Sequence, residues 1–176
     1  MTVDKAQLLR QIENAFAATR RGDGVSLHEA VAIDDHASEA ERRAARLKDG
    51  DTHWREVPDE HIARHSAVFS FLDLRGHVYY APAYMCWLLR TGYDTSSNSV
   101  ESAQFAFDPW GKHEGGRHYK PDEMFTPEQC ACIACYLHYI YEVLDERSCC
   151  STAKEYLDAY WSRYLRGDHD MFNAPS

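Results

Sequence analysis

TPEQCACIACYLHYIYEVLDE, residues 126–146, carries the clearest helix signal in the chain. Thr126 suits an N-cap, Pro127 the first helical position, and Gln129 the third position of a capping box. The residues that follow are apolar nearly all round the helix instead of along one stripe. The segment therefore predicts a central, buried helix.

Weaker helix signals lie on both sides of this segment. Capping boxes begin at Ser26 and Ser38, Pro58 suits the first position of another helix, and Gly76 and Pro82 are expected to end one helix and to open the next. The expected helices cover residues 4–20, 26–36 and 38–48 (two helices, or one helix with a break near His36), a segment from Pro58, 82–90, 126–146, and a last helix capped by Ser151. Residues 97–107 are a further candidate for a short helix. Because no convincing alternating strand appears, the fold class predicted is all-α, an irregular bundle of about six to seven helices.

The whole chain, residues 1–176, is expected to form a single helical domain. Within it, residues 108–124, DPWGKHEGGRHYKPDEM, are rich in glycine and histidine and show no periodicity. We expect them to form a long loop, and such loops are often functional or mobile. Gly167 is expected to end the last helix, and residues 168–176 to form a frayed tail.

Charge and hydropathy exclude several function classes. The net charge is −9, and the two halves of the chain carry −3 and −6, so neither half has the basic surface of a nucleic-acid-binding protein. The longest uncharged apolar stretches, 78–89 and 130–141, are shorter than the roughly 20 residues of a membrane span. The N-terminus lacks the apolar region of a secretory signal, so we expect a cytoplasmic protein whose six cysteines are reduced.

A cysteine-rich pattern lies inside the central predicted helix. Cys132, Cys135 and His138 follow one another at intervals of three residues, after Cys130. Zinc needs about four converging ligands, and one straight helix rarely offers more than two. We therefore expect small cysteines that let neighbouring helices pack closely, and we expect neither a metal nor another cofactor.

An acidic segment is the first candidate for a functional surface. Asp34 and Asp35 fall near a predicted helix C-terminus, where the helix dipole disfavours carboxylates. Structural explanations are a cap on the next helix or neutralisation by nearby arginines. The functional alternatives are a partner-facing acidic patch that includes Glu29, or a metal or catalytic site that includes His36.

The loop at 108–124 is the second candidate. Trp110 and Arg117 are of the residue types that are common in protein-binding hot spots. The alternative is an ordinary loop that Trp110 anchors in the core. The loop histidines can act as acid and base, but no paired carboxylate or nucleophile stands nearby at a diagnostic spacing.

Four segments together resemble a family of uncharacterised bacterial proteins, a domain of unknown function. They are SLHEAVAIDD, WREVPDEHI, GHVYYAPAYMCWLL and FTPEQCACIACYLHYI, with the YY-x-PAY and FTPEQ motifs as the most specific parts. The resemblance covers roughly residues 4–142. It implies a bacterial cytosolic origin and a helical fold, and it carries no catalytic residues.

Two functions are compatible with this sequence. The first is a non-enzymatic bacterial protein-binding module, such as an immunity or accessory protein, that binds a basic protein partner. Its expected contacts are Glu29, Asp34, Asp35, Trp110 and Arg117. The alternative is a small metal-dependent or acid–base enzyme that uses Asp34, Asp35 and His36. The sequence lacks a phosphate-binding glycine loop, a nucleophile elbow and an HExxH zinc motif.

Overall fold

The computed structural model describes residues 4–165. In this range the chain forms nine α-helices, seven of them with at least seven residues, and one small two-stranded sheet, which confirms the mostly helical, irregular fold. The α-helices are α1 (Lys5–Ala15), α2 (Leu27–Asp34), α3 (Glu39–Arg46), α4 (Asp59–Arg64), α5 (Leu74–Thr91), α6 (Ser99–Phe105), α7 (Pro121–Met124), α8 (Pro127–Tyr139) and α9 (Thr152–Ala159). Short 3₁₀ turns form η1 (Trp54–Glu56), η2 (Val68–Ser70) and η4 (Trp161–Tyr164), and a π-helical turn, η3 (Ile140–Leu144), extends α8. The predicted tail at 168–176 and the stop at Gly167 lie outside the described residues.

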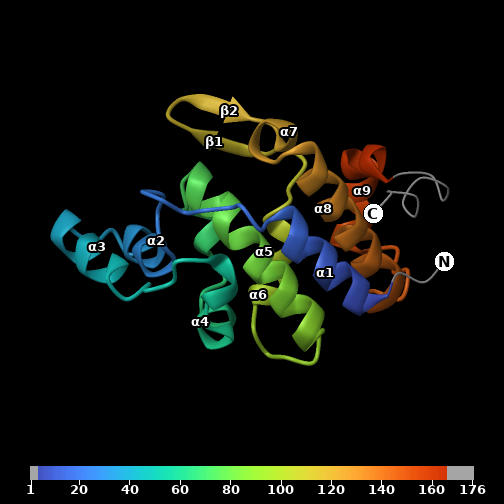
Figure 1. Ribbon diagram of the computed structural model, residues 1–176, viewed down its shortest axis with the longest axis horizontal. Helices are drawn as coiled ribbons and strands as arrows, with labels where there is room; N and C mark the ends of the chain where they lie inside the picture. Colours follow the sequence, from blue (N-terminus) through green and yellow to red (C-terminus); the bar gives the residue numbers. More distant parts are fainter. Residues whose placement is uncertain (1–3, 166–176) are drawn as a thin grey trace.

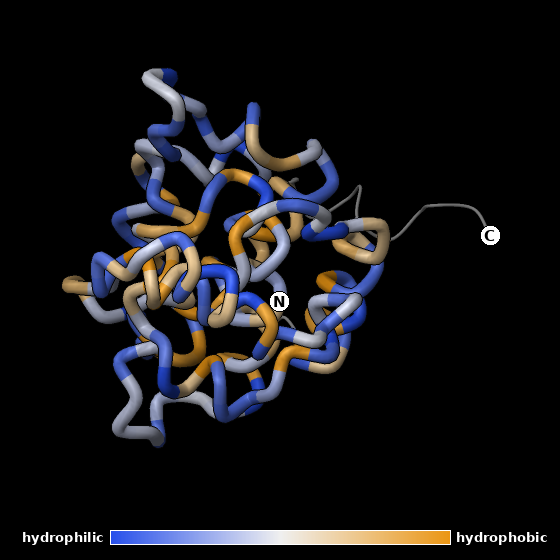
Figure 2. Tube along the Cα trace, turned by 90° about the vertical axis from the view of Figure 1, so that its left-hand side faces the viewer, coloured by the Kyte–Doolittle hydropathy of each residue, from blue (hydrophilic) through white to orange (hydrophobic). Residues whose placement is uncertain are grey.

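Helices α5 and α8 supply almost half of the buried hydrophobic residues, more than any other elements. Figure 1 shows α5 in the middle of the molecule, next to α1 and α6, with α8 between α1 and α9. The hydrophobic segments lie mainly inside and the hydrophilic ones mainly outside, as Figure 2 shows. The largest fully buried side chains are aromatic, and they include Trp161, Tyr79, Tyr80, Tyr84 and Tyr136. This aromatic core fixes the elements that carry the site described below.

The prediction that Gly76 ends one helix and Pro82 begins the next is wrong, because both residues lie inside α5. A proline inside a helix removes one backbone hydrogen bond and costs about 3 kcal/mol. Burial of almost the whole helix from Gly76 to Leu89 outweighs that cost. Gly76 is required for close packing, since a Cβ at this position would lie 2.4 Å from the carbonyl oxygen of Val25. The chain that leads into α2 therefore passes directly against the first turn of α5.

Residues 108–124, expected as a loop, contain a β-hairpin followed by α7. Strands β1 (Lys112–Glu114) and β2 (Arg117–Tyr119) pair antiparallel, with His113 opposite His118. Gly115 and Gly116 form the turn with φ of +58° and +78°, the left-handed conformation that a tight hairpin needs at both positions. The carboxylate of Glu114 accepts a hydrogen bond from the N–H of Leu74 and so attaches the hairpin to the start of α5. Figure 1 shows the hairpin projecting at the top edge of the molecule.

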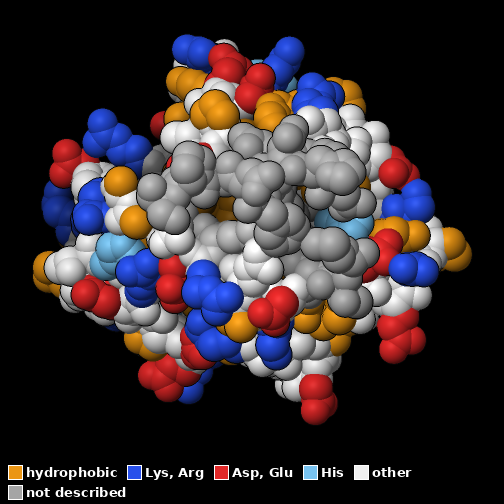
Figure 3. Space-filling view, turned by 45° about the vertical axis from the view of Figure 1, so that its right-hand side comes forward, with side chains coloured by type: hydrophobic (Ala, Val, Ile, Leu, Met, Phe, Trp, Pro, Cys, Tyr) orange, Lys and Arg blue, Asp and Glu red, His pale blue; other side chains and the backbone are white. Residues whose placement is uncertain are grey.

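The surface carries charges of both signs. On the face shown in Figure 3, lysine and arginine side chains are interspersed with aspartate and glutamate wherever described residues are drawn. Within residues 4–165, no helix combines the length and the apolar character that crossing a membrane requires.

Candidate functional site

The first turn of α2 is held by side chains from distant parts of the chain. The N–H of Leu27 donates to the hydroxyl of Tyr80 on α5, at 3.1 Å. The N–H of His28 donates to Oδ2 of Asp49, at 2.8 Å, although Asp49 lies in the connection after α3. These two bonds satisfy donors that a helix N-terminus cannot pair internally. They therefore fix the position of His28, the second residue of α2.

The short helix α4 is fixed by hydroxyl groups that bond its last carbonyls. The hydroxyls of Ser97, Ser99 and Ser102, on and just before α6, donate to the carbonyls of Ala63, Ile62 and Ser66, respectively. The hydroxyl of Tyr84 donates to the carbonyl of His65. A helix of six residues is marginal on its own, so these contacts determine where it lies.

This placement of α4 determines where two histidines lie. His61 lies in the helix, and His65 is its C-terminal cap, four residues later. Residues four apart share a helix face, so both side chains are presented on the same side. Their rings lie 4.8 Å and 4.9 Å from the ring of His28, in edge-to-face contact.

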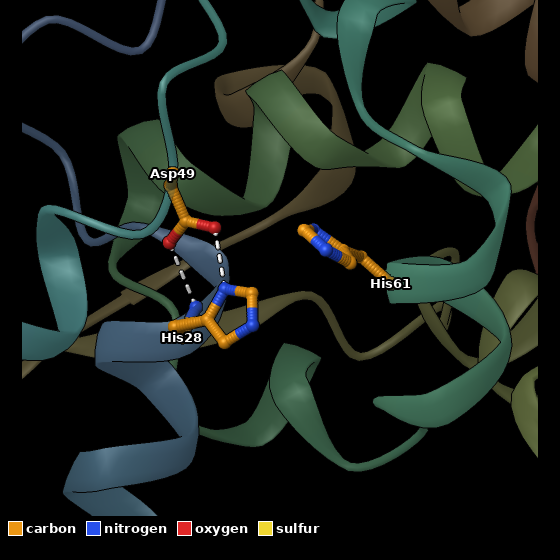
Figure 4. Close-up of side chains that lie close together, drawn as sticks. All are labelled: His28, Asp49 and His61. Atoms are coloured by element: carbon orange, nitrogen blue, oxygen red, sulfur yellow. Dashed lines mark hydrogen bonds and ion pairs between the residues drawn. The ribbon is translucent and has the colours of Figure 1, made fainter.

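His28, Asp49 and His61 form a compact group of possible metal ligands, with His65 beside it. One side-chain nitrogen or oxygen from each of His28, Asp49 and His61 lies within 4.8 Å of the other two. Nδ1 of His28 is 2.6 Å from Oδ1 of Asp49. Figure 4 shows His61 pointing from its own helix toward the pair formed by His28 and Asp49.

The carboxylate of Asp49 is the most buried charged group in this cluster. Its side chain is 2 % exposed, and that of His28 is 17 % exposed. Within residues 4–165, no lysine or arginine nitrogen lies within 4.0 Å of this carboxylate, so its contacts are the ring and the N–H of His28. A buried carboxylate is costly unless a cation or several donors compensate it. A metal ion next to Asp49 would compensate this buried carboxylate.

The surroundings of His65 shift its pKa. Burial lowers its pKa below the usual value of 6.5, and the neighbouring imidazoles of His28 and His61 lower the pKa further. The carboxylate of Asp49 opposes this effect but does not reverse it. A neutral imidazole is the form that binds a metal or accepts a proton.

This arrangement permits two kinds of chemistry. Two imidazoles and one carboxylate match the ligands of a catalytic zinc site, which keeps one position open. A carboxylate that bonds one nitrogen of a histidine also orients the other nitrogen as a base. In the described part of the chain, no hydroxyl or thiol hydrogen-bonds to the rings of His28, His61 or His65, so the cluster lacks the arrangement of a covalent nucleophile.

Comparison with known proteins identifies the family but not a function. A family model described as "Family of unknown function (DUF6714)" matches residues 4–165. The chain belongs to this family. No curated protein and no solved structure matches the chain. The matched range contains the whole histidine cluster and agrees with the resemblance inferred from the sequence.

The acidic residues singled out in the sequence lie at two different places in this family member. Glu29 accepts hydrogen bonds from the N–H of Ser26, at 3.1 Å, and from Arg46, at 2.7 Å. Asp34 and Asp35 are exposed at the opposite end of α2, and no ion pair forms on either within the described residues. The cap of α3 is Ser38, so neither predicted structural explanation for these two aspartates applies.

His36 has a backbone role at this end of α2. Its φ of +54° places it in the left-handed conformation that terminates many helices. Among the described residues, the only group that could hold a metal is formed by His28, Asp49 and His61, and it does not contain Asp34, Asp35 or His36.

The predicted loop contacts lie on the hairpin, away from α2. Trp110 is 79 % exposed just before β1, so it does not anchor the segment in the core. The guanidinium of Arg117 bonds Glu123 and lies 4.5 Å from the ring of Tyr119. Figure 1 places the hairpin and the α2–α3 pair at separate edges of the molecule. The five predicted contacts therefore do not form one continuous patch.

The cysteine-rich face of α8 is part of the core. Cys130, Cys132 and Cys135 are buried, and burial raises the pKa of each thiol. Thiols in such surroundings stay protonated, whereas metal binding requires the thiolate.

Proposed function

We propose that this protein binds a first-row divalent transition-metal ion, with zinc as the reference, through His28, His61 and Asp49. The observation that carries the proposal is the convergence of two histidines from different helices on one buried carboxylate. A purely structural role of Asp49 as a cap on α2 accounts for its bond to His28. It does not account for His61 and His65 beside that pair.

The distances between the three candidate ligand atoms are compatible with a metal site. Zinc–nitrogen and zinc–oxygen bonds of about 2 Å place tetrahedral ligand atoms about 3.3 Å apart. The three candidate atoms lie within 4.8 Å of one another, so small side-chain rotations bring them into range. The two imidazoles favour zinc, copper, iron or nickel over calcium or magnesium.

His65 supplies the second element of the proposal. Three protein ligands would leave one position of a tetrahedral ion open, and an ion held by them would make a water at that position more acidic. The ring of His65 contacts that of His28, so one more imidazole lies next to the proposed ligands and would be available as a base. The chemistry this supports is metal-assisted hydrolysis of a small polar substrate. This proposal departs from the expectation, drawn from the sequence, that the protein binds neither a metal nor another cofactor.

Metal affinity of matched variants tests the proposal. We expect one zinc ion per chain in competition with a chromogenic chelator, and affinity at least tenfold weaker for His61→Ala and for Asp49→Asn. His138→Ala is the control, because it removes an imidazole from α8 and should leave affinity unchanged. Equal affinity in all four proteins, or no binding by the wild type, would overturn the proposal. Circular dichroism of each variant separates loss of ligands from loss of the fold.

A protein-binding module is the second candidate, and the hairpin favours it. Trp110 is an exposed aromatic residue on a projecting element, and Arg117 is exposed on the same element. In this candidate the protein has a non-enzymatic immunity or accessory role. A basic partner also contacts the free carboxylates of Asp34 and Asp35, and the carboxylate of Glu29, which already binds Arg46. Capture of a host protein by the wild type but not by Trp110→Ala tests it.

We further infer a bacterial origin and a cytoplasmic location. All six cysteines are free thiols, including the neighbouring Cys149 and Cys150, which supports a reducing compartment. Microscopy of a tagged chain in its host tests the location.

A further inference from the structure

A second potential site lies beneath the β-hairpin, apart from the histidine cluster. It is a cavity of about 250 Å³ between the hairpin, η2, the end of α6 and η4. Its walls include the aromatic side chains of Phe69, Phe107, Phe125 and Trp161. A volume of this size is below the roughly 300 Å³ at which pockets for drug-sized ligands begin, so it suits a molecule of one ring and a short side chain.

Lys112 gives this aromatic cavity a positive charge. The residue lines the cavity from β1, and its ammonium donates one hydrogen bond, at 3.1 Å, to the carbonyl of Phe69. An ammonium has three donors, and this bond occupies one of them. In the described part of the chain, no carboxylate lies within 4.0 Å of this ammonium. A half-buried cation without a paired anion favours the binding of an anionic group.

The carboxylates nearest to Lys112 are engaged elsewhere. Glu114 accepts from the N–H of Leu74, and Asp73 accepts from the N–H groups of Val25 and Gly76, at 2.9 Å and 2.8 Å. Asp108, which also lines the cavity, accepts from the N–H of Trp110. These bonds hold the three carboxylates at backbone donors. Burial lowers the pKa of Lys112, and the charges of Glu114 and Asp73 oppose this effect without reversing it.

We propose that this cavity binds a small aromatic carboxylate, with its ring among Phe69, Phe107, Phe125 and Trp161 and its carboxylate on the ammonium of Lys112. The ring fills the space that these side chains enclose, and the carboxylate supplies the missing counter-charge. The corresponding neutral amide has the same shape. It keeps the contacts of the ring but lacks the charge that pairs with Lys112. The cavity therefore discriminates by charge between two ligands of equal size.

Phenylacetate and phenylacetamide provide this comparison. We expect phenylacetate to bind the wild-type protein at least tenfold more tightly than phenylacetamide, measured by nuclear magnetic resonance titration. The backbone amide signals of Gly111 and Lys112 should shift during the titration. Lys112→Met keeps the aliphatic stem and removes the charge, so the preference should fall below about twofold. Lys120→Met removes an exposed ammonium that lies at the same end of the hairpin as Lys112 but does not line the cavity, and it should keep the full preference.

Three results would overturn the proposal. They are no binding of phenylacetate at about 10 mM, equal binding of the two ligands by the wild type, and an unchanged preference in Lys112→Met. The first two need only the wild-type protein, so they decide the matter even if a variant fails to fold. The outcome is independent of metal binding, because the cavity shares no residue with the histidine cluster.

Discussion

Replacing His77 with glutamine should remove a large part of the protein's sensitivity to mild acid. His77 lies on α5, is buried, and has its Nε2 2.7 Å from the carbonyl of Ala106. Its Nδ1 has no hydrogen-bond partner among the described residues. Burial lowers the pKa of His77 to about 4 from the usual 6.5, although the bond to Ala106 partly opposes this effect. The folded protein therefore keeps this ring neutral where the unfolded chain binds a proton.

The sign and size of the effect follow from this difference. Between about pH 6.5 and pH 4 the unfolded state binds more protons at His77, so the free energy of unfolding falls as the pH falls. One pKa unit corresponds to roughly 1.4 kcal/mol, so this residue alone costs about 2 kcal/mol between pH 7.5 and pH 5. Above the unfolded-state pKa the penalty disappears.

Urea unfolding at these two pH values measures the prediction. Glutamine reaches the same carbonyl with its amide and does not titrate. His77→Gln should therefore be less stable than the wild type at pH 7.5, yet lose about 2 kcal/mol less on going to pH 5. The difference between the two proteins isolates His77 from the other titrating groups. If both lose the same free energy, His77 is not held neutral and the reasoning is refuted.

Four further variants compare buried positions with exposed ones. Gly76→Ala should lower the free energy of unfolding by about 2 kcal/mol in urea, because its Cβ would meet a carbonyl 2.4 Å away; unchanged stability would contradict this close approach. Replacing Asp34 and Asp35 together by alanine should keep stability within about 1 kcal/mol of the wild type, or above it, because both are exposed near a helix C-terminus; a large drop in melting temperature would show a structural role. Trp161→Phe should cost about 2–4 kcal/mol, since the indole is fully buried and donates to a carbonyl at 2.7 Å, whereas Trp110→Phe should change stability by less than about 0.5 kcal/mol.

Local signals in the sequence predict most of the helices because their caps involve neighbouring residues. Thr126, Ser38 and Ser151 cap α8, α3 and α9 as expected. The predictions at Gly76 and Pro82 were wrong because the deciding contacts are not local. There, contacts with residues far away in the sequence outweigh the local preference of glycine and proline to interrupt a helix.

The hairpin has a local sequence signal that is independent of helix or strand periodicity. Two consecutive glycines, Gly115 and Gly116, are typical of a tight turn between short strands. The strands have three residues each, too few for an alternating pattern to stand out.

The histidine cluster was only half predictable. His61 and His65 stand four residues apart after a helix start at Pro58, a spacing that places two imidazoles on one helix face. That signal was available in the sequence. The partner of His28 was not, because Asp49 is 21 residues away and reaches the first turn of α2 only through the packing of α3 and the connection that follows it.

Zinc titration followed through the ring nitrogen signals of the histidines tests the central claim most directly. The chain has ten histidines, so the experiment reports which rings bind the ion. The account predicts that one equivalent of zinc shifts the signals of His28 and His61, changes that of the neighbouring His65, and leaves His113, His118 and His138 unchanged. No change at one equivalent of zinc, or changes confined to the hairpin histidines, would contradict a metal site built on Asp49.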